Sequence, residues 1–103
     1  MKLTEYQKSD LWHGTIFRFP AGYPFESSVD FMLMDYPHSE SGFALYCVSG
    51  YHARSLELVL PREAASPVNC SISSQWMAEN WSKWVYAECM AADVEIVEKK
   101  TAY

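Results

Sequence analysis

The feature that most constrains this chain is its load of large aromatic side chains: four tryptophans, seven tyrosines and five phenylalanines in 103 residues. Each ring buries a large area at low conformational cost, so these side chains favour a compact core or a contact with another molecule. The chain carries more of them than a core of this size needs. The sequence therefore predicts a small globular domain that uses some aromatic residues for recognition.

Length and composition fit a single domain over residues 1–103. Half of the residues are apolar and a fifth are charged, which is typical of a chain that folds alone. The first residues lack the apolar segment of an export signal, and no apolar run approaches the roughly 20 residues that span a bilayer. The three cysteines are widely spaced and odd in number. We therefore expect a soluble, cytoplasmic protein without a membrane partner.

The chain is acidic, with a formal net charge of -5 at pH 7. We expect no nucleic-acid partner, because binding to phosphates requires clustered lysine and arginine. Residues 20–60 carry five acids, and Arg54 is the single base among them. This half of the chain is expected either to present a negative face to a basic partner or to form an ordinary soluble surface.

Alternating apolar residues predict four strands, then one helix, then a last strand. The strands are expected at residues 11–19, 29–36, 43–49, 54–60 and 93–98. Strands two to four should form an antiparallel meander, with Leu56, Leu58 and Leu60 on one face of the fourth, and residues 61–71 should form a loop. The predicted fold is α+β: an antiparallel sheet of four to five strands packed against one helix, in the order β-β-β-β-α-β.

The second strand has two faces of different character. By the two-residue period of a strand, Val29, Phe31 and Leu33 point to one side. The other side mixes acidic and apolar groups, and its residues are Asp30, Met32, Met34 and Tyr36. This side is either covered by another part of the chain or left free for a partner.

A helix is expected to begin after Ser73, which has the character of an N-cap, and to end near Tyr86. At helical spacing Trp81 and Trp84 fall on the apolar side, so both are expected in the core. Trp76 in the first turn is expected to be partly exposed and available to anchor a partner.

No recognised pattern for catalysis or metal binding is present. His13, His38 and His52 lack the spacing of a zinc motif, and the four glycines form no phosphate-binding loop. A nucleophilic pair of Cys47 and His52 could form only in space, and a buried apolar cysteine is the simpler interpretation. We expect no catalysis, no metal and no cofactor.

Arg18 lies on the same strand face as Trp12 and Ile16, which predicts that it is partly buried. A buried guanidinium requires a carboxylate partner. Glu26, just beyond the loop that follows, is the nearest candidate in sequence. The favoured interpretation is a structural clamp of Arg18 and Glu26 that holds this loop closed.

Five segments resemble one known family when they are taken together. They are GTIFRFP at 14–20, VDFML at 29–33, SGFAL at 41–45, SGY at 49–51 and NWSKWVY at 80–86. The chain resembles immunity protein family forty-five of bacterial polymorphic toxin systems. The resemblance implies a cytoplasmic α+β antidote that binds a cognate secreted toxin and performs no catalysis. After the SGY segment the family carries Lys-Ala-Gly, whereas this chain has His52, Ala53 and Arg54.

These interpretations favour an immunity protein whose partner is a bacterial toxin with a basic active-site surface. The candidate toxin-binding residues are Asp30, Met32, Met34, Asp35, Tyr36, Glu40, Tyr51 and Trp76. Two other classes stay open: a homodimeric interaction or adaptor module, and a small enzyme that uses a carboxylate or cysteine site.

Overall fold

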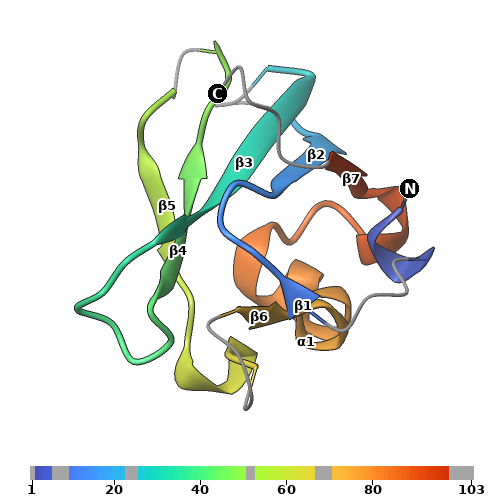
Figure 1. Ribbon diagram of the computed structural model, residues 1–103. Coiled ribbons are helices and arrows are strands. Elements are labelled where there is room, and N and C mark those ends of the chain that lie inside the picture. Colours follow the sequence, from blue (N-terminus) through green and yellow to red (C-terminus); the bar gives the residue numbers. More distant parts are fainter. Residues whose placement is uncertain (1, 6–9, 23–25, 51–52, 67–70, 98–103) are drawn as a thin grey trace.

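The chain forms one five-stranded antiparallel sheet with a layer of short helices on one side (Figure 1). The structure is a computed structural model that describes residues 2–5, 10–22, 26–50, 53–66 and 71–97. The strands are β2 (Ile16–Pro20), β3 (Ser28–Asp35), β4 (Phe43–Cys47), β5 (Leu56–Val59) and β7 (Glu95–Val97). They lie in the order β5-β4-β3-β2-β7. The predicted α+β fold and its meander are confirmed.

The second layer combines helical turns with a short ribbon. A two-stranded sheet is made by β1 (Asp10–Leu11) and β6 (Ile72–Ser73). From β6 the chain runs directly into α1 (Ser74–Asn80) and then into η4 (Trp81–Val85), which is a π-helical turn. Single 3-10 turns complete the layer, namely η1 (Leu3–Glu5), η3 (Arg62–Ala64) and η5 (Ala91–Asp93).

The helix begins where the sequence predicts and changes type before its predicted end. Ser73 is the N-cap, and its hydroxyl oxygen accepts a hydrogen bond from the backbone N–H of Trp76 at 3.2 Å. At the other end the N–H of Tyr86 donates to the carbonyl of Trp81 at 3.1 Å. This bond spans five residues, so the last turn is wider than an α-helical turn.

The single strand predicted over residues 11–19 is wrong, because a turn divides it. Gly14 has a φ of +94°, a left-handed conformation that glycine adopts without steric cost. The backbone N–H and the hydroxyl of Thr15 both donate to the carbonyl of Trp12, at 3.1 and 2.8 Å. Leu11 therefore pairs with β6 in the second layer, and only residues from Ile16 onward enter the main sheet.

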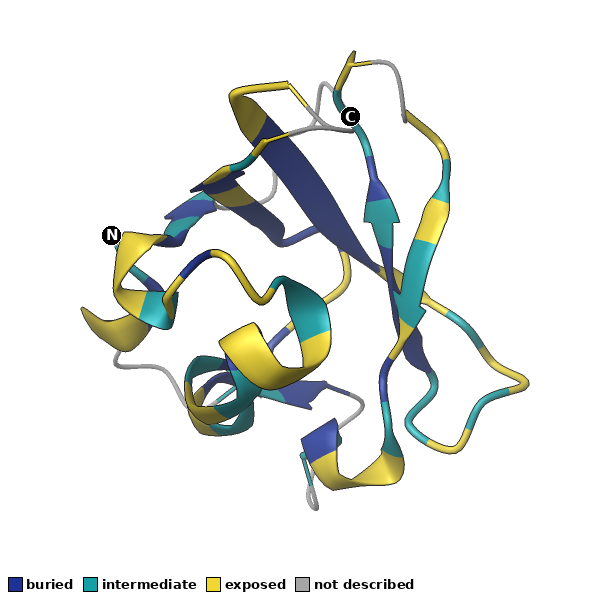
Figure 2. Ribbon diagram, turned by 180° about the vertical axis from the view of Figure 1, so that it is seen from behind, coloured by how far each residue is buried: buried dark blue, intermediate teal, exposed yellow. Residues whose placement is uncertain are grey.

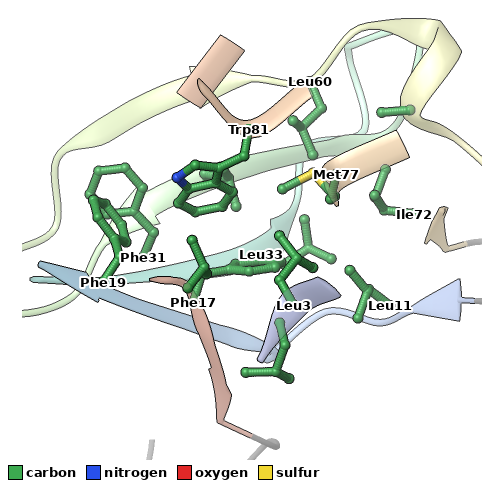
Figure 3. Close-up of a cluster of buried hydrophobic side chains, with 14 of the residues drawn as sticks. Leu3, Leu11, Phe17, Phe19, Phe31, Leu33, Leu60, Ile72, Met77 and Trp81 are labelled. Atoms are coloured by element: carbon green, nitrogen blue, oxygen red, sulfur yellow. The ribbon is translucent and has the colours of Figure 1, made fainter. Parts of the chain in front are cut away.

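Trp81 lies at the centre of the core, between the helical layer and the sheet (Figure 3). Its side chain is fully buried, and its ring centroid is 5.5 Å from that of Phe17 and 5.1 Å from that of Phe19. Met77 and Leu33 belong to the same buried cluster. Viewed from behind, the helical turns are exposed on their outer side, whereas the centre of the sheet is buried (Figure 2). The helical layer is therefore fixed to the sheet through aromatic contacts.

Trp84 does not lie in the core, which corrects the sequence-based expectation. Its side chain is 43% exposed, and its ring packs against Trp76 with centroids 5.9 Å apart. The wide π-helical turn is the physical reason. It spreads Trp81 and Trp84 further apart around the axis than an α-helix would, so only Trp81 faces the sheet.

A β-bulge in β5 changes which residues share a face. Leu58 pairs with Leu45 and Leu56 pairs with Tyr46, so Glu57 between them has no position opposite it on β4. Leu58 packs against the core, whereas Leu56 points to the other side of the sheet and is exposed. The predicted common face of Leu56, Leu58 and Leu60 is therefore wrong at Leu56.

Arg54 adopts a left-handed backbone conformation just before β5. Its φ is +78°, and within the described ranges every other residue with positive φ is a glycine. The conformation is held by a hydrogen bond of 2.6 Å from the N–H of Arg54 to the carbonyl of Cys47. A side chain in this region of φ collides with its own backbone. Arg54 therefore carries backbone strain that glycine would relieve.

The two helical tryptophans should differ sharply in their contribution to stability. Trp81→Ala should lower the free energy of unfolding by about 3–5 kcal/mol, because it removes a buried ring from a packed core. Trp84→Ala should cost less than about 1 kcal/mol, because its ring is half in solvent. Urea denaturation of both variants measures the difference, and equal losses would contradict the placement of Trp84.

Replacing Arg54 with glycine should stabilise the fold. Arg54→Gly removes the left-handed strain and should raise the free energy of unfolding by up to about 1 kcal/mol. Ala53→Gly is the control, since φ at Ala53 is not positive and added glycine flexibility should reduce stability there. Thermal melts that rank Arg54→Gly below the parent chain would argue against strain at this turn.

Candidate functional site

Three candidate residues on β3, namely Asp30, Met32 and Met34, belong to the outer face, which we define as the face of the sheet turned away from the helical layer. Asp35 pairs with the core residue Phe43 and is directed to the other face. Cross-strand pairing groups its side chains into rows. One row joins Ile16, Met32, Tyr46 and Leu56, and the next joins Met34, Ala44 and Val59. These rows put residues from four strands onto one surface.

Arg18 and Asp30 form a bidentate ion pair on the outer face. Nε and Nη2 of Arg18 donate to the two carboxylate oxygens of Asp30 at 2.8 and 3.0 Å. The two residues are directly opposite on β2 and β3, and Asp30 is buried. The backbone N–H of Asp30 also donates to the hydroxyl of Ser49 at 2.9 Å. The charge of Asp30 is therefore matched within the chain by the residue opposite it on β2.

The carboxylate of Glu26 lies against Gly50 in the turn after β4. A Cβ atom at Gly50 would collide with this carboxylate, and the φ of Gly50 is +64°, so two independent constraints favour glycine there. The ionic partner that the structure gives Arg18 is Asp30. Cross-strand register places Asp30 opposite Arg18, and Glu26 reaches the turn at Gly50. The clamp of Arg18 and Glu26 stays a prediction.

The end of β3 carries the accessible part of the predicted site. Met32 is buried, whereas Met34 is 39% exposed. Asp35 is exposed, with an oxygen 3.8 Å from Nδ1 of His13. Tyr36 is half-buried, and Glu40 is exposed in the turn that follows. The structure therefore brings four of the predicted residues, Met34, Asp35, Tyr36 and Glu40, to one end of the sheet.

Hydrogen bonds fix the turn between β3 and β4. The N–H of Tyr36 donates to the carbonyl of Gly42 at 2.7 Å. The hydroxyl of Ser39 donates to the carbonyl of Tyr36 at 2.9 Å and accepts from the N–H of Gly42 at 3.0 Å. The hydroxyl of Ser41 donates to the carbonyl of Leu60 at 2.7 Å. The turn is thus preorganised, which lowers the entropy lost when a partner binds.

Two residues of β5 extend this surface and were missed from the sequence. Val59 is 37% exposed and lies in the same cross-strand row as Met34, with the buried Ala44 between them. Leu56 is 44% exposed in the adjacent row. We call Met34, Leu56 and Val59 the outer-face patch. The alternation of Leu58, Val59 and Leu60 could have identified Val59 as a residue of the outer face. A two-residue period puts Leu56 on the face of Leu58, and the bulge that reverses Leu56 has no signal in the sequence.

Trp76 lies on the helical layer, apart from the other candidates. It is half-buried, and its contact with Trp84 creates an aromatic pair on the outside of the helix. Tyr51 lies outside the described residues. The predicted site therefore divides into the outer-face patch with its acidic surroundings and a separate tryptophan pair.

Cys47 and Cys89, the two cysteines among the described residues, are poorly suited to nucleophilic chemistry. Burial raises the pKa of the Cys47 thiol, as it does that of Cys89, and both side chains are buried. A raised thiol pKa lowers the thiolate fraction at neutral pH, and the thiolate is the reactive form. His52, the other member of the conceivable pair, lies outside the described residues. Within the described ranges no three His, Cys, Asp or Glu side chains are grouped to hold a metal.

A shallow cavity of about 350 Å³ lies at the other end of the sheet, near β7. Its walls include Lys2, Arg18, Asp93 and Glu95. Lys2 lies 3.8 Å from Glu95, and Arg18 is bound to Asp30, so three of these four charged residues make ion pairs within the chain. In the described part of the chain, no helix has the length and apolar character required to cross a bilayer.

Loss of the Asp30 charge should destabilise the protein. Arg18 itself is exposed, contrary to the sequence-based expectation, so the buried partner in this pair is Asp30. Asp30→Asn replaces the buried carboxylate with an amide that cannot accept both hydrogen bonds from Arg18, and should cost about 1–3 kcal/mol. Asp35→Asn is the matched control on the same strand, and its exposure predicts a change within about 0.5 kcal/mol. Urea melts that gave the two variants equal stability would contradict a structural role for Asp30.

Comparison with known proteins supports the family suggested by the sequence motifs. The family model described as Immunity protein 45 matches residues 3–96, which is most of the chain. A comparison with curated proteins and one with solved structures each gave no match. The matched range contains the whole sheet except the last residue of β7, together with the complete helical layer. The chain therefore belongs to the Immunity protein 45 family.

Proposed function

We propose that this protein is a cytoplasmic immunity protein that neutralises a cognate bacterial toxin by binding it, without catalysis of its own. The family match over residues 3–96 is the observation that carries this proposal. The surface adds support, because the outer-face patch exposes three large apolar side chains on a rigid sheet. The candidate toxin for testing this proposal is the product of the gene immediately upstream.

The outer-face patch and its surroundings have the composition of a protein-binding surface. Met34 and Val59 supply apolar area that a partner can desolvate. Asp35 and Glu40 lie exposed at the end of β3 and in the next turn, and Tyr36 lies between them. A toxin that acts on nucleic acid has a basic active-site surface, so acids around an apolar centre are complementary to it.

The tryptophan pair is a second candidate surface. Trp84 is exposed although tryptophan is costly to leave in water, and Trp76 supports its ring from the preceding turn. Tryptophan is enriched among the residues that dominate binding energy at interfaces. If the toxin does not bind the outer face, the tryptophan pair is the surface that we propose instead.

The alternative classes have weaker support. A homodimeric module would bring together two copies with a formal net charge of -5 each, which opposes association at low ionic strength. A small enzyme with a cysteine nucleophile would require a reactive thiol, whereas burial raises the pKa of Cys47. A carboxylate site would draw on Asp30 or Asp35, but Asp30 is bound to Arg18 and the two residues point to opposite faces of β3.

Variants at the end of β3 should separate the kinetic roles of charge and apolar contact. Asp35→Lys or Glu40→Lys should mainly slow association and weaken its salt dependence, because long-range attraction is reduced. Tyr36→Ala should mainly speed dissociation, since it removes a contact made in the complex. Stopped-flow binding to the product of the upstream gene, at several salt concentrations, measures both rates.

Glu88→Lys is the matched control for charge, because Glu88 is an exposed acid in the turn after η4, on the helical layer. It should leave both rates nearly unchanged. Each variant is also melted in urea, so that a loss of binding is compared among folded molecules. If folded Asp35→Lys and Tyr36→Ala proteins still protect cells fully, the end of β3 is not the binding surface. Loss of protection by Trp84→Ala would then assign binding to the tryptophan pair.

A further inference from the structure

The two edges of the sheet differ in how they are covered. At the β7 edge the chain forms a bridge between Lys2 and Glu95, and the N–H of Leu3 donates to the carbonyl of Val94 at 2.8 Å. The N-terminal segment therefore runs along that side. At the other edge, no strand among the described residues pairs with the outer side of β5.

The backbone of Val59 points outward from this edge. The N–H of Leu60 donates to the carbonyl of Phe43 at 3.1 Å, which makes these two residues a hydrogen-bonded pair. Val59 is one position earlier and lies opposite Ala44. Because hydrogen-bonded and non-bonded pairs alternate in an antiparallel ladder, the N–H and carbonyl of Val59 are directed away from β4. They are the groups to which an added strand would bond.

The side chains next to this edge favour an added strand of particular chemistry. Val59 and Leu56 are exposed on the outer face of β5, so an added strand could place apolar side chains beside them. Glu57, the bulged residue between them, contributes negative charge, and β5 itself has neither lysine nor arginine. Arg54 and Arg62 lie beyond the two ends of the strand, and the chain as a whole has a formal net charge of -5. We propose that β5 accepts an extended cationic segment of the partner toxin as a sixth strand of the sheet.

A second copy of this chain fits the same edge poorly. If two β5 strands paired through Val59, then Glu57 of each would lie opposite Pro61 of the other. Proline has no N–H, so Pro61 of each copy could not donate a hydrogen bond to the other copy, and the pairing would lose two bonds. A strand from another protein would pair with only one Pro61, so only one bond would be lost. The net charge of -5 on each copy adds repulsion. The partner strand is therefore assigned to another protein.

This inference rests on the proposed function for the identity of the partner, but its test does not require a toxin. The probes are three capped hexapeptides: one alternates lysine and valine, one alternates glutamate and valine, and one is the lysine peptide with methylated backbone nitrogens. Amide hydrogen exchange of the intact protein is followed by NMR. The lysine peptide in excess should slow exchange at Val59 by about tenfold, whereas the other two should not.

Two variants of Val59 separate backbone pairing from side-chain contact. Val59→Pro removes an N–H that serves no bond to β4, so the fold should persist, while affinity for the lysine peptide should fall by about three- to tenfold. Val59→Thr keeps the N–H and the shape and should bind almost as well. Urea melts confirm that both variants fold.

Three results would overturn the proposal. Unchanged exchange at Val59 with the lysine peptide would exclude strand addition at this edge. Equal protection by the glutamate peptide would remove the charge preference. A dimer of the free protein in sedimentation equilibrium that Val59→Pro dissociates would assign the edge to a second copy. None of these results tests toxin neutralisation, which is measured by the protection assay. The proposal of strand addition can therefore fail while the proposed function stands, and the reverse.

Discussion

The packing of Trp81 against the aromatic residues of β2 is the interaction on which the rest of the structure depends. The indole fills the space between the sheet and the helical layer, where it contacts Phe17 and Phe19. The sheet is short-stranded and the helix has only seven residues, so neither element is stable without the other. Fixing the helical layer on one face by this contact leaves the opposite face of the sheet available for binding.

One part of the outer face stabilises the fold, and another part is exposed to solvent. Around β2 and the start of β3, the ion pair of Arg18 and Asp30 and the burial of Met32 serve stability. Toward β5 and the end of β3, apolar and acidic side chains are exposed on a backbone that hydrogen bonds hold rigid. A rigid surface of this kind binds with a small entropic cost. Under the proposed function, stability and recognition would therefore occupy different parts of one sheet, and mutation of one part should have limited effect on the other.

Sequence reasoning predicted the elements whose signals are local. Alternation identified the meander of β3, β4 and β5, and Ser73 marked the helix start. It failed where a single residue changed the geometry. Gly14 divided a segment that was predicted as one strand, the π-helical turn moved Trp84 outward, and the bulge at Glu57 reversed Leu56. The ion pair of Arg18 and Asp30 was missed for another reason, since the two residues are known to be opposite each other only when the register of β2 and β3 is known.

The bulge in β5 also affects how this fold tolerates changes in chain length. Glu57 has no counterpart on β4, so a chain without it would pair Leu56 with Tyr46 and Leu58 with Leu45 as before, in a regular ladder. A one-residue deletion elsewhere in the strand would instead turn every following side chain to the wrong face. Insertion or deletion at this position should therefore reshape the sheet edge without any change of buried residues.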